Sequence, residues 1–238
     1  MLKFMNSRAK FWQSMLAKSW LAQPCLLCRA ASRNGLFCAA CETDLPYLTA
    51  PHCPVCAAPT AGADVCGHCL KDPPHFQRTV ACFAYTFPLD KLVQALKYGE
   101  QLVLVNSLAD KLALRVDVCP DYLVPMPLHP VRLRERGFNQ SMELARRVGY
   151  KLSIPVLTDA CQRVRDTPPQ TALSWKERGK NIRHAFACTQ DLSGKSVAVV
   201  DDVMTSGASL NELALTLRNA GASEVSAWVV ARTLPFKS

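Results

Sequence analysis

Residues 197–209 read VAVVDDVMTSGAS, and this stretch decides the fold of the larger part of the chain. Its first half is an apolar strand of the kind that is buried on both faces, and it ends in two carboxylates, Asp201 and Asp202. A turn of small residues then opens a helix, so main-chain N–H groups, hydroxyls and the helix N-terminus converge and favour binding of one phosphate group. The acids would repel that phosphate, and we expect them to face sugar hydroxyls or a hydrated Mg2+ ion. The turn comprises Thr205, Ser206, Gly207, Ala208 and Ser209.

Predicted strands and helices alternate on both sides of this stretch. Their order predicts an α/β fold, with a parallel sheet flanked by helices on both faces. In such a sheet, ligand sites form at the carboxyl ends of the strands. The patterns predict strands at 78–88, 122–127, 154–157, 196–202 and 224–233, and helices at 89–115 (broken at Gly99), 138–151 and 206–220.

The positive charge is concentrated in the middle of the chain. The 238 residues carry a formal charge of +9, and residues 120–185 hold twelve lysines and arginines against six acidic residues. A basic loop after strand 122–127 is expected to bind pyrophosphate, because guanidinium groups make paired contacts with phosphate oxygens and a glycine lets the main chain approach closely. This loop carries Arg132, Arg134, Arg136 and Gly137.

Two further polar segments are candidates for ligand contact. The loop at 165–186 is long and polar, which favours a lid that closes over a charged ligand; an inert surface loop is the alternative. The lid residues would be Arg165, Gln170, Arg178 and Asn181. Lys97 and Tyr98 end an apolar helix, and the simpler interpretation is a solvated helix end, with an anion contact as the alternative.

Eight of the 12 cysteines form four Cys-x-x-Cys pairs near the N-terminus. Gaps of nine, eleven and nine residues separate the pairs, which indicates a duplicated unit and two zinc ions, each held by four thiolates. The repeat favours sequential pairing over an interleaved cross-brace, and disulfides or redox pairs are the alternative to metal. His52 and His68 stand beside the pairs and are interpreted as bystanders. The predicted ligands are Cys25, Cys28, Cys38 and Cys41, then Cys53, Cys56, Cys66 and Cys69.

Three regions follow from these patterns: a basic N-terminal helix at 1–24, a double zinc ribbon at 25–74 and an α/β domain at 79–238. Hydrophobic residues make up 49% and charged residues 20%, a balance that excludes wholesale disorder. We expect neither a secretory leader nor a membrane-spanning segment, since no apolar run reaches about 18 residues. The expected location is the cytoplasm, with membrane-surface contact by the N-terminal helix as an alternative.

Residues 197–209 resemble the motif with which phosphoribosyltransferases bind 5-phosphoribosyl 1-diphosphate (PRPP). Three segments make the chain similar to the ComF family (ComFC/GntX-like): LKYG (96–99), VPMPLHPVRLRERGFNQSMELAR (124–146) and residues 163–186. The resemblance implies an N-terminal zinc module and a type I phosphoribosyltransferase-like sheet. It also implies that Asp201 and Asp202 meet the ribose 2′ and 3′ hydroxyls, that Thr205 to Ser209 hold the 5′-phosphate, and that magnesium accompanies PRPP.

Three functions remain open at this point. The favoured one is a PRPP- and Mg-binding protein that binds single-stranded DNA through backbone charge and stacking. The resemblance to the ComF family implies that it acts in DNA uptake or utilisation, as in natural competence, alongside DNA-uptake or helicase machinery. The second is an active phosphoribosyltransferase with an unknown acceptor in nucleotide metabolism; whether the chain is catalytic, and through which residues, is left undecided. The third is a non-enzymatic, zinc-stapled module for protein interaction.

Overall fold

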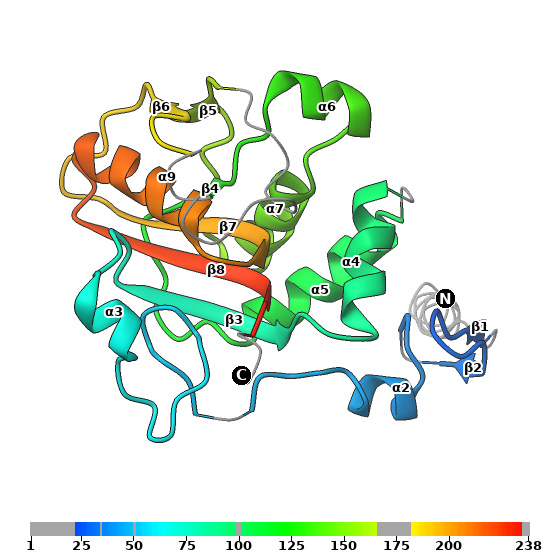
Figure 1. Cartoon of the computed structure of the whole chain (residues 1–238). Coiled ribbons are helices and arrows are strands. Elements are labelled where there is room, and N and C mark those ends of the chain that lie inside the picture. Colours follow the sequence, from blue (N-terminus) through cyan, green and yellow to red (C-terminus); the bar gives the residue numbers. More distant parts are fainter. Residues whose placement is uncertain (1–21, 34, 50, 99–100, 166–181, 235–238) are drawn as a thin grey trace, which may run out of the picture. The chain divides into compact units, whose positions relative to one another are not determined.

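The computed structural model describes residues 22–33, 35–49, 51–98, 101–165 and 182–234 (Figure 1). The chain divides into two compact units, Met1–Leu45 and Pro46–Ser238, and each is described by itself. Residues 1–21 of the expected N-terminal helix lie outside the described residues. Within the described residues, no helix has both the length and the apolar character that a membrane crossing requires.

The first unit is built around the first two cysteine pairs. Strands β1 (Gln23–Pro24) and β2 (Ala31–Ser32) form a small antiparallel ribbon, and helix α2 (Ala39–Thr43) follows. The hydroxyl of Ser32 donates to the carbonyl of Phe37 at 2.8 Å, which closes the turn after the ribbon. Elements this short bury little apolar surface, so the fold of this unit depends on what its cysteines bind.

The second unit contains a four-stranded parallel sheet, which confirms the predicted α/β class. The strand order is β3 (Arg78–Ala84), β8 (Glu224–Arg232), β7 (Ser196–Met204) and β4 (Tyr122–Pro125). The strands are almost wholly buried, as expected for parallel strands covered on both faces. Because all four run the same way, their carboxyl ends meet at one edge.

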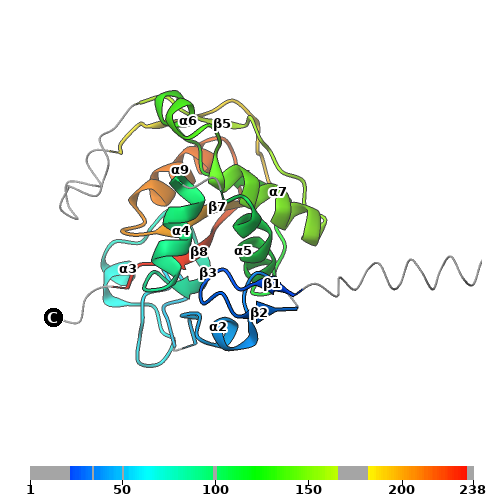
Figure 2. The same cartoon turned by 90° about the vertical axis from the view of Figure 1, so that its right-hand side faces the viewer.

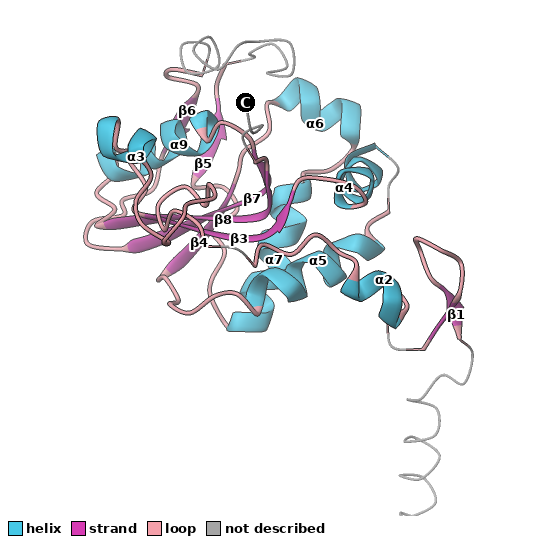
Figure 3. Cartoon of the chain, turned by 60° about the horizontal axis from the view of Figure 1, so that its bottom comes forward, coloured by secondary structure: helices cyan, strands magenta, loops and turns pink. Residues whose placement is uncertain are grey.

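Helices cover both faces of this sheet (Figures 2 and 3). Helices α5 (Val103–Ala113) and α7 (Gln140–Leu152) lie against one face and α9 (Ala208–Asn219) lies against the other. The short helix α3 (Gly67–Lys71) belongs to the second pair of Cys-x-x-Cys motifs, which is thus part of this unit. Helix α4 (Leu89–Tyr98) follows β3 in the sequence and precedes α5.

Two predicted elements differ from the structure. The strand predicted at 154–157 is wrong: only a single bridge joins Val156 to Leu123, because the chain touches β4 and turns away. Residues Pro130–Arg136 form helix α6 in place of the expected basic loop. Proline at the first helical position and Gly137 in the left-handed region (φ 76°) after the last are the signals that the basic residues obscured.

A short antiparallel hairpin stands outside the main sheet. Strands β5 (Cys161–Arg163) and β6 (Phe186–Cys188) pair on either side of the segment predicted as a lid. Sequence periodicity did not reveal either strand, because three residues are too few to show a pattern.

The outer edge of β3 is covered by the residues that open the second unit. Tyr47 bridges Phe83 in antiparallel fashion, and the two rings stack at a tilt with centroids 4.6 Å apart. The N–H of Leu48 donates to the Cys82 carbonyl (3.0 Å), and the N–H of Ala84 donates to the Pro46 carbonyl (2.8 Å). Residues 46–48 therefore act as a short fifth strand along this edge.

Candidate functional site: the carboxyl edge of the sheet

The acidic pair lies near the end of β7, where the carboxyl ends of the strands meet. Asp202 is 3% exposed, and its N–H donates to Oδ1 of Asp201 at 2.9 Å. Such burial is costly for adjacent carboxylates, so each needs a partner from a neighbouring element. Those partners come from helices α4 and α7, which lie far from β7 in the sequence.

Helix α7 supplies the partner of Asp201. Asn139 caps this helix, accepting hydrogen bonds from the N–H groups of Ser141 (3.0 Å) and Met142 (3.3 Å). The Asn139 amide in turn donates to the carbonyl of Met126 (3.0 Å), which fixes the start of α7 beside the end of β4. In this position the buried hydroxyl of Ser141 donates to Oδ1 of Asp201 at 2.8 Å.

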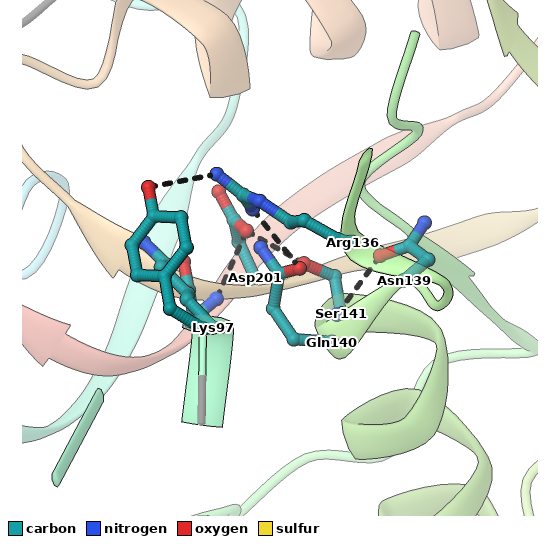
Figure 4. Close-up of polar contacts among 8 residues, drawn as sticks. Lys97, Arg136, Asn139, Gln140, Ser141 and Asp201 are labelled. Atoms are coloured by element: carbon teal, nitrogen blue, oxygen red, sulfur yellow. Dashed lines mark hydrogen bonds and ion pairs between the residues drawn. The ribbon is translucent and has the colours of Figure 1, made fainter. Parts of the chain in front are cut away.

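Helix α4 supplies the partner of Asp202. The Lys97 ammonium lies 2.8 Å from Oδ2 of Asp202, and the two side chains are 21% and 5% exposed. The interpretation of Lys97 as a solvated helix end is therefore wrong. The last turn of α4 reaches the carboxyl edge of the sheet and places its lysine against the acidic pair (Figure 4).

One carboxyl of the cluster, that of Asp201, has a pKa close to neutral pH. Burial and the charge of Asp202 raise the pKa of Asp201 to about 7, against the opposing effects of the Ser141 hydroxyl and Lys97. Burial acts to lower the pKa of Lys97, but the charge of Asp202 and the contact with it outweigh burial, and the net shift is upward. The lysine is thus charged, while Asp201 can gain or lose a proton near pH 7.

One of the three predicted arginines joins this cluster. Arg136 donates to the Gln140 side chain (3.2 Å) and to the Tyr98 hydroxyl (3.3 Å), and its guanidinium lies 5.1 Å from the centre of the Tyr98 ring. Figure 4 shows Lys97, Arg136 and Ser141 gathered around Asp201. Arg132 instead pairs with Glu135 one turn along α6 (2.9 Å), and Arg134 is exposed. Helix α6, absent from the prediction, turns Arg134 away from Arg132 and Arg136, which are four residues apart and share one face of the helix.

The predicted phosphate turn follows β7 and opens α9 as expected. Gly207 adopts φ 81°, a left-handed conformation that favours glycine and would be strained for any other residue. The N–H of Ala208 donates to Oγ of Ser206 (3.3 Å) and that of Asn211 to the carbonyl of Gly207 (2.8 Å). Thr205, Ser206 and Ser209 are all half-buried.

The segment proposed as a lid is described only at its two ends. Arg165 donates to the main-chain carbonyl of Arg183, so the two ends meet. Gln170, Arg178 and Asn181 lie outside the described residues. The hairpin β5–β6 brings the ends together.

The eight paired cysteines form two sequential clusters, as the repeat predicts. Cluster 1 contains Cys25, Cys28, Cys38 and Cys41, and cluster 2 contains Cys53, Cys56, Cys66 and Cys69. Within each cluster the sulfur atoms all lie within 4.8 Å of one another. The sulfurs of Cys28 and Cys38 are 3.6 Å apart, as are those of Cys56 and Cys66, close to the ~3.8 Å of a tetrahedral site with Zn–S bonds of about 2.3 Å.

Main-chain N–H groups lower the pKa of one thiol in each cluster. Burial acts to raise the pKa of Cys25 and Cys53, but N–H donors from the knuckle turns outweigh it and lower these pKa values to about 6 and about 7. One such donor is the N–H of Cys66, 3.3 Å from the sulfur of Cys53. Neighbouring thiols and burial raise the pKa values of Cys41, Cys56 and Cys69, so the lowering does not extend to every thiol of either cluster. A zinc ion held by four such sulfurs would favour the thiolate form of all of them and supply folding energy.

This fold and these two kinds of site define an α/β phosphoribosyltransferase-type protein with a double zinc ribbon. The sequence matches the family described as "Double zinc ribbon domain" over residues 16–70 and that described as "Phosphoribosyl transferase domain" over residues 134–234.

Similarity to named proteins extends over most of the chain. Competence protein F of Haemophilus influenzae is 33% identical, covering 87% of this chain and 96% of that protein. DNA utilization protein YhgH of Salmonella typhimurium is 35% identical, covering 88% and 97%. Competence protein ComFC of Bacillus subtilis is 25% identical, covering 82% and 84%. The chain therefore belongs to the ComF family.

Proposed function

We propose that this protein binds PRPP with Mg2+ at the carboxyl edge of the sheet. The observation that carries the proposal is that strand β7 bears Asp201 and Asp202 and leads directly into the phosphate turn, with the cationic ends of Lys97 and Arg136 beside the acids. A ligand with two adjacent hydroxyls a few ångströms from a monophosphate matches this order of groups. The Phosphoribosyl transferase domain matched over residues 134–234 supports the same ligand class.

Each group has a defined task in this proposal. The carboxylates of Asp201 and Asp202 would accept hydrogen bonds from the ribose hydroxyls, and residues 205–209 would donate to the 5′-phosphate. Lys97 and Arg136 would turn towards the pyrophosphate, since the acids gain other partners once ribose is bound. Magnesium, when bound, supplies further positive charge to the pyrophosphate oxygens.

Calorimetric titration of the protein with PRPP and Mg2+ tests this proposal. We expect saturable binding of PRPP by the wild type. The Asp202→Asn variant should bind PRPP at least tenfold more weakly, because a neutral amide replaces the buried carboxylate that would accept hydrogen bonds from the ribose. Glu224→Gln, an exposed and equivalent change at the amino end of β8, is the matched control and should bind as the wild type does. Absence of binding by the wild type overturns the proposal.

We further propose that the protein works on single-stranded DNA in the cytoplasm. Relatives named for competence and for DNA utilization support this role, and the two four-cysteine sites of a double zinc ribbon suit a reducing compartment. The basic middle segment offers charge for a phosphate backbone, and Arg134 on α6 is exposed.

Fluorescence anisotropy with a labelled single-stranded oligonucleotide, measured across a salt series, tests the DNA contact. We expect affinity to fall steeply with salt, and Arg134→Ala to reduce the slope of log affinity against log salt by about 0.7, the value for one lost phosphate contact on a single strand. Arg218→Ala, an exposed arginine on α9, is the control. Salt-independent retention, or equal effects of both variants, contradicts the DNA contact.

Phosphoribosyl transfer is a second candidate function, favoured by a cavity of ≈ 550 Å³ beside the phosphate turn. Its walls include Phe76, Ile182, His184 and Ser206, a mixture of apolar and hydrogen-bonding side chains that suits a small acceptor. Release of pyrophosphate from PRPP on addition of adenine or ammonium chloride would support catalysis by the wild type. PRPP binding without such release with either probe leaves ligand binding as the preferred function.

A further inference from the structure

The second cysteine cluster is tied to the sheet through three consecutive carbonyls of its first knuckle. The Pro54 carbonyl accepts from the N–H of Thr79 (3.1 Å), and the Val55 carbonyl accepts from the Thr79 hydroxyl (2.5 Å). The Cys56 carbonyl accepts from Nε of Arg232 at 2.8 Å. Thr79 belongs to β3 and Arg232 ends β8, so the two strands hold the knuckle from both sides.

The same arginine holds the start of the phosphate turn. Arg232 is 4% exposed, and its Nη1 donates to the carbonyls of Met204 (3.1 Å), Thr205 and Thr233 (2.7 Å). Met204 is the last residue of β7, and Thr205 is the first residue of the turn. One buried guanidinium therefore connects a metal-ligand knuckle with the main chain that leads into the turn.

Charge balance explains why an arginine can be buried there. A buried cation is costly unless negative charge lies nearby. Burial lowers the pKa of Arg232, and the thiols of Cys56, Cys69 and Cys66 oppose that shift. A tetrathiolate cluster holding one divalent zinc ion keeps a net negative charge, which favours the charged guanidinium.

We propose that Arg232 is a positioning residue through which metal in cluster 2 sets the conformation of the phosphate turn. The metal fixes the knuckle and its Cys56 carbonyl, this carbonyl orients the guanidinium, and the guanidinium holds the carbonyls of Met204 and Thr205. Cluster 1 belongs to the other compact unit and takes no part in this chain of contacts. The assignment of phosphate to the turn rests on the proposed function, whereas the coupling itself does not.

Hydrogen–deuterium exchange of the full-length protein tests the coupling without any ligand. In Arg232→Met, and in a Cys53→Ser/Cys56→Ser variant that loses metal from cluster 2, the amides of residues 204–210 should exchange at least tenfold faster than in the wild type. The matched Cys25→Ser/Cys28→Ser variant should leave these amides unchanged. Fast exchange throughout α7 would show that the cluster 2 variant does not fold. In that case the exchange of residues 204–210 in Arg232→Met decides whether Arg232 positions the turn.

Ligand binding then separates positioning from general stability. Affinity for ribose 5-phosphate should fall about tenfold in Arg232→Met, the effect of losing buried hydrogen bonds, while affinity for inorganic pyrophosphate should change less than twofold. Arg232→Lys, which can reach carbonyls but lacks the fork that spans both segments, should give an intermediate result. Equal losses for both probes would contradict a positioning role.

Failure of the proposed function and failure of the coupling between cluster 2 and the phosphate turn give different results. If the wild type binds neither PRPP nor ribose 5-phosphate, the proposed function fails, and the exchange of residues 204–210 still decides the coupling. If the wild type binds both but the exchange of 204–210 is unchanged in Arg232→Met, or rises equally on loss of cluster 1, the coupling is wrong.

Discussion

The Lys97 ammonium lies 2.8 Å from the carboxylate of Asp202, and so the last turn of α4 neutralises an acid near the end of β7. The two residues are far apart in the sequence, and both are shielded from solvent. This ion pair gives the buried Asp202 carboxylate a partner of opposite charge. It also makes the stability of the fold sensitive to changes at the site.

Lys97→Met should destabilise the protein, because it leaves the Asp202 charge buried without its partner. We expect a decrease of up to about 3 kcal/mol in the unfolding free energy at pH 7, measured by urea denaturation. The double variant Lys97→Met/Asp202→Asn should recover most of this loss. If the two single effects simply add, the residues do not interact as the geometry indicates.

Asp201 should make stability depend on pH between its ordinary pKa of 3.8 and about 7. In that window the folded state holds a proton that the unfolded state releases, so the unfolding free energy should fall as the pH rises. Asp201→Asn should flatten this part of the profile, measured by denaturation at several pH values between 4 and 8. A profile unchanged by Asp201→Asn would show that the carboxyl is ionised throughout.

Ser141→Ala should raise the pKa of Asp201 above about 7, because the hydroxyl donates to the ionised form. Carbon-13 NMR of the carboxyl group, followed through a pH titration, measures the shift. Ser193→Ala is the control, because the Ser193 hydroxyl donates to Asp191 and not to Asp201. The Asp201 titration should be the same in this control as in the wild type.

Metal analysis should find two zinc ions per chain, and one in the Cys25→Ser/Cys28→Ser variant. A strong chelator should unfold the described part of the first unit, residues 22–45, whose helix and strands are short, while the parallel sheet persists in circular dichroism. A wild-type protein that holds no zinc and reacts with no thiol reagent would point to disulfides instead.

Arg136→Ala should weaken pyrophosphate binding more than Arg132→Ala does. Arg136 faces the acidic cluster beside Tyr98, whereas Arg132 is paired with Glu135 on the surface of α6. We expect a difference of about tenfold in affinity, the effect of one charge-assisted hydrogen bond. Competition with PRPP measures it, and equal effects of the two variants would place the pyrophosphate elsewhere.

The elements that sequence reasoning predicted are those whose signals are local. The apolar run, the acidic pair and the small-residue turn lie within residues 197–209, and the strand, turn and helix occur there. The cysteine spacing likewise predicted two sequential clusters, because a knuckle is a local structure. In each case the residues that form the feature are near neighbours in the chain.

The partners that complete the site could not be predicted, because each depends on how distant elements meet. Nothing in the helix 89–98 says that Lys97 ends opposite Asp202, and Ser141 reads as an ordinary residue in the first turn of a helix. Arg232 reads as the charged end of a strand, where exposure is the usual outcome. The packing of strands and helices brings these side chains to the site, and periodicity does not describe packing.

The pairing of residues 46–48 with β3 covers the outer edge strand of the sheet. An uncovered outer strand would present free main-chain donors and acceptors to any other chain with the same edge. A fragment that starts at residue 79, the predicted domain boundary, would lose Tyr47 from its place beside Phe83 and expose that edge. The residues ahead of cluster 2 therefore cover main-chain groups of the sheet that would otherwise be open to pairing with another chain.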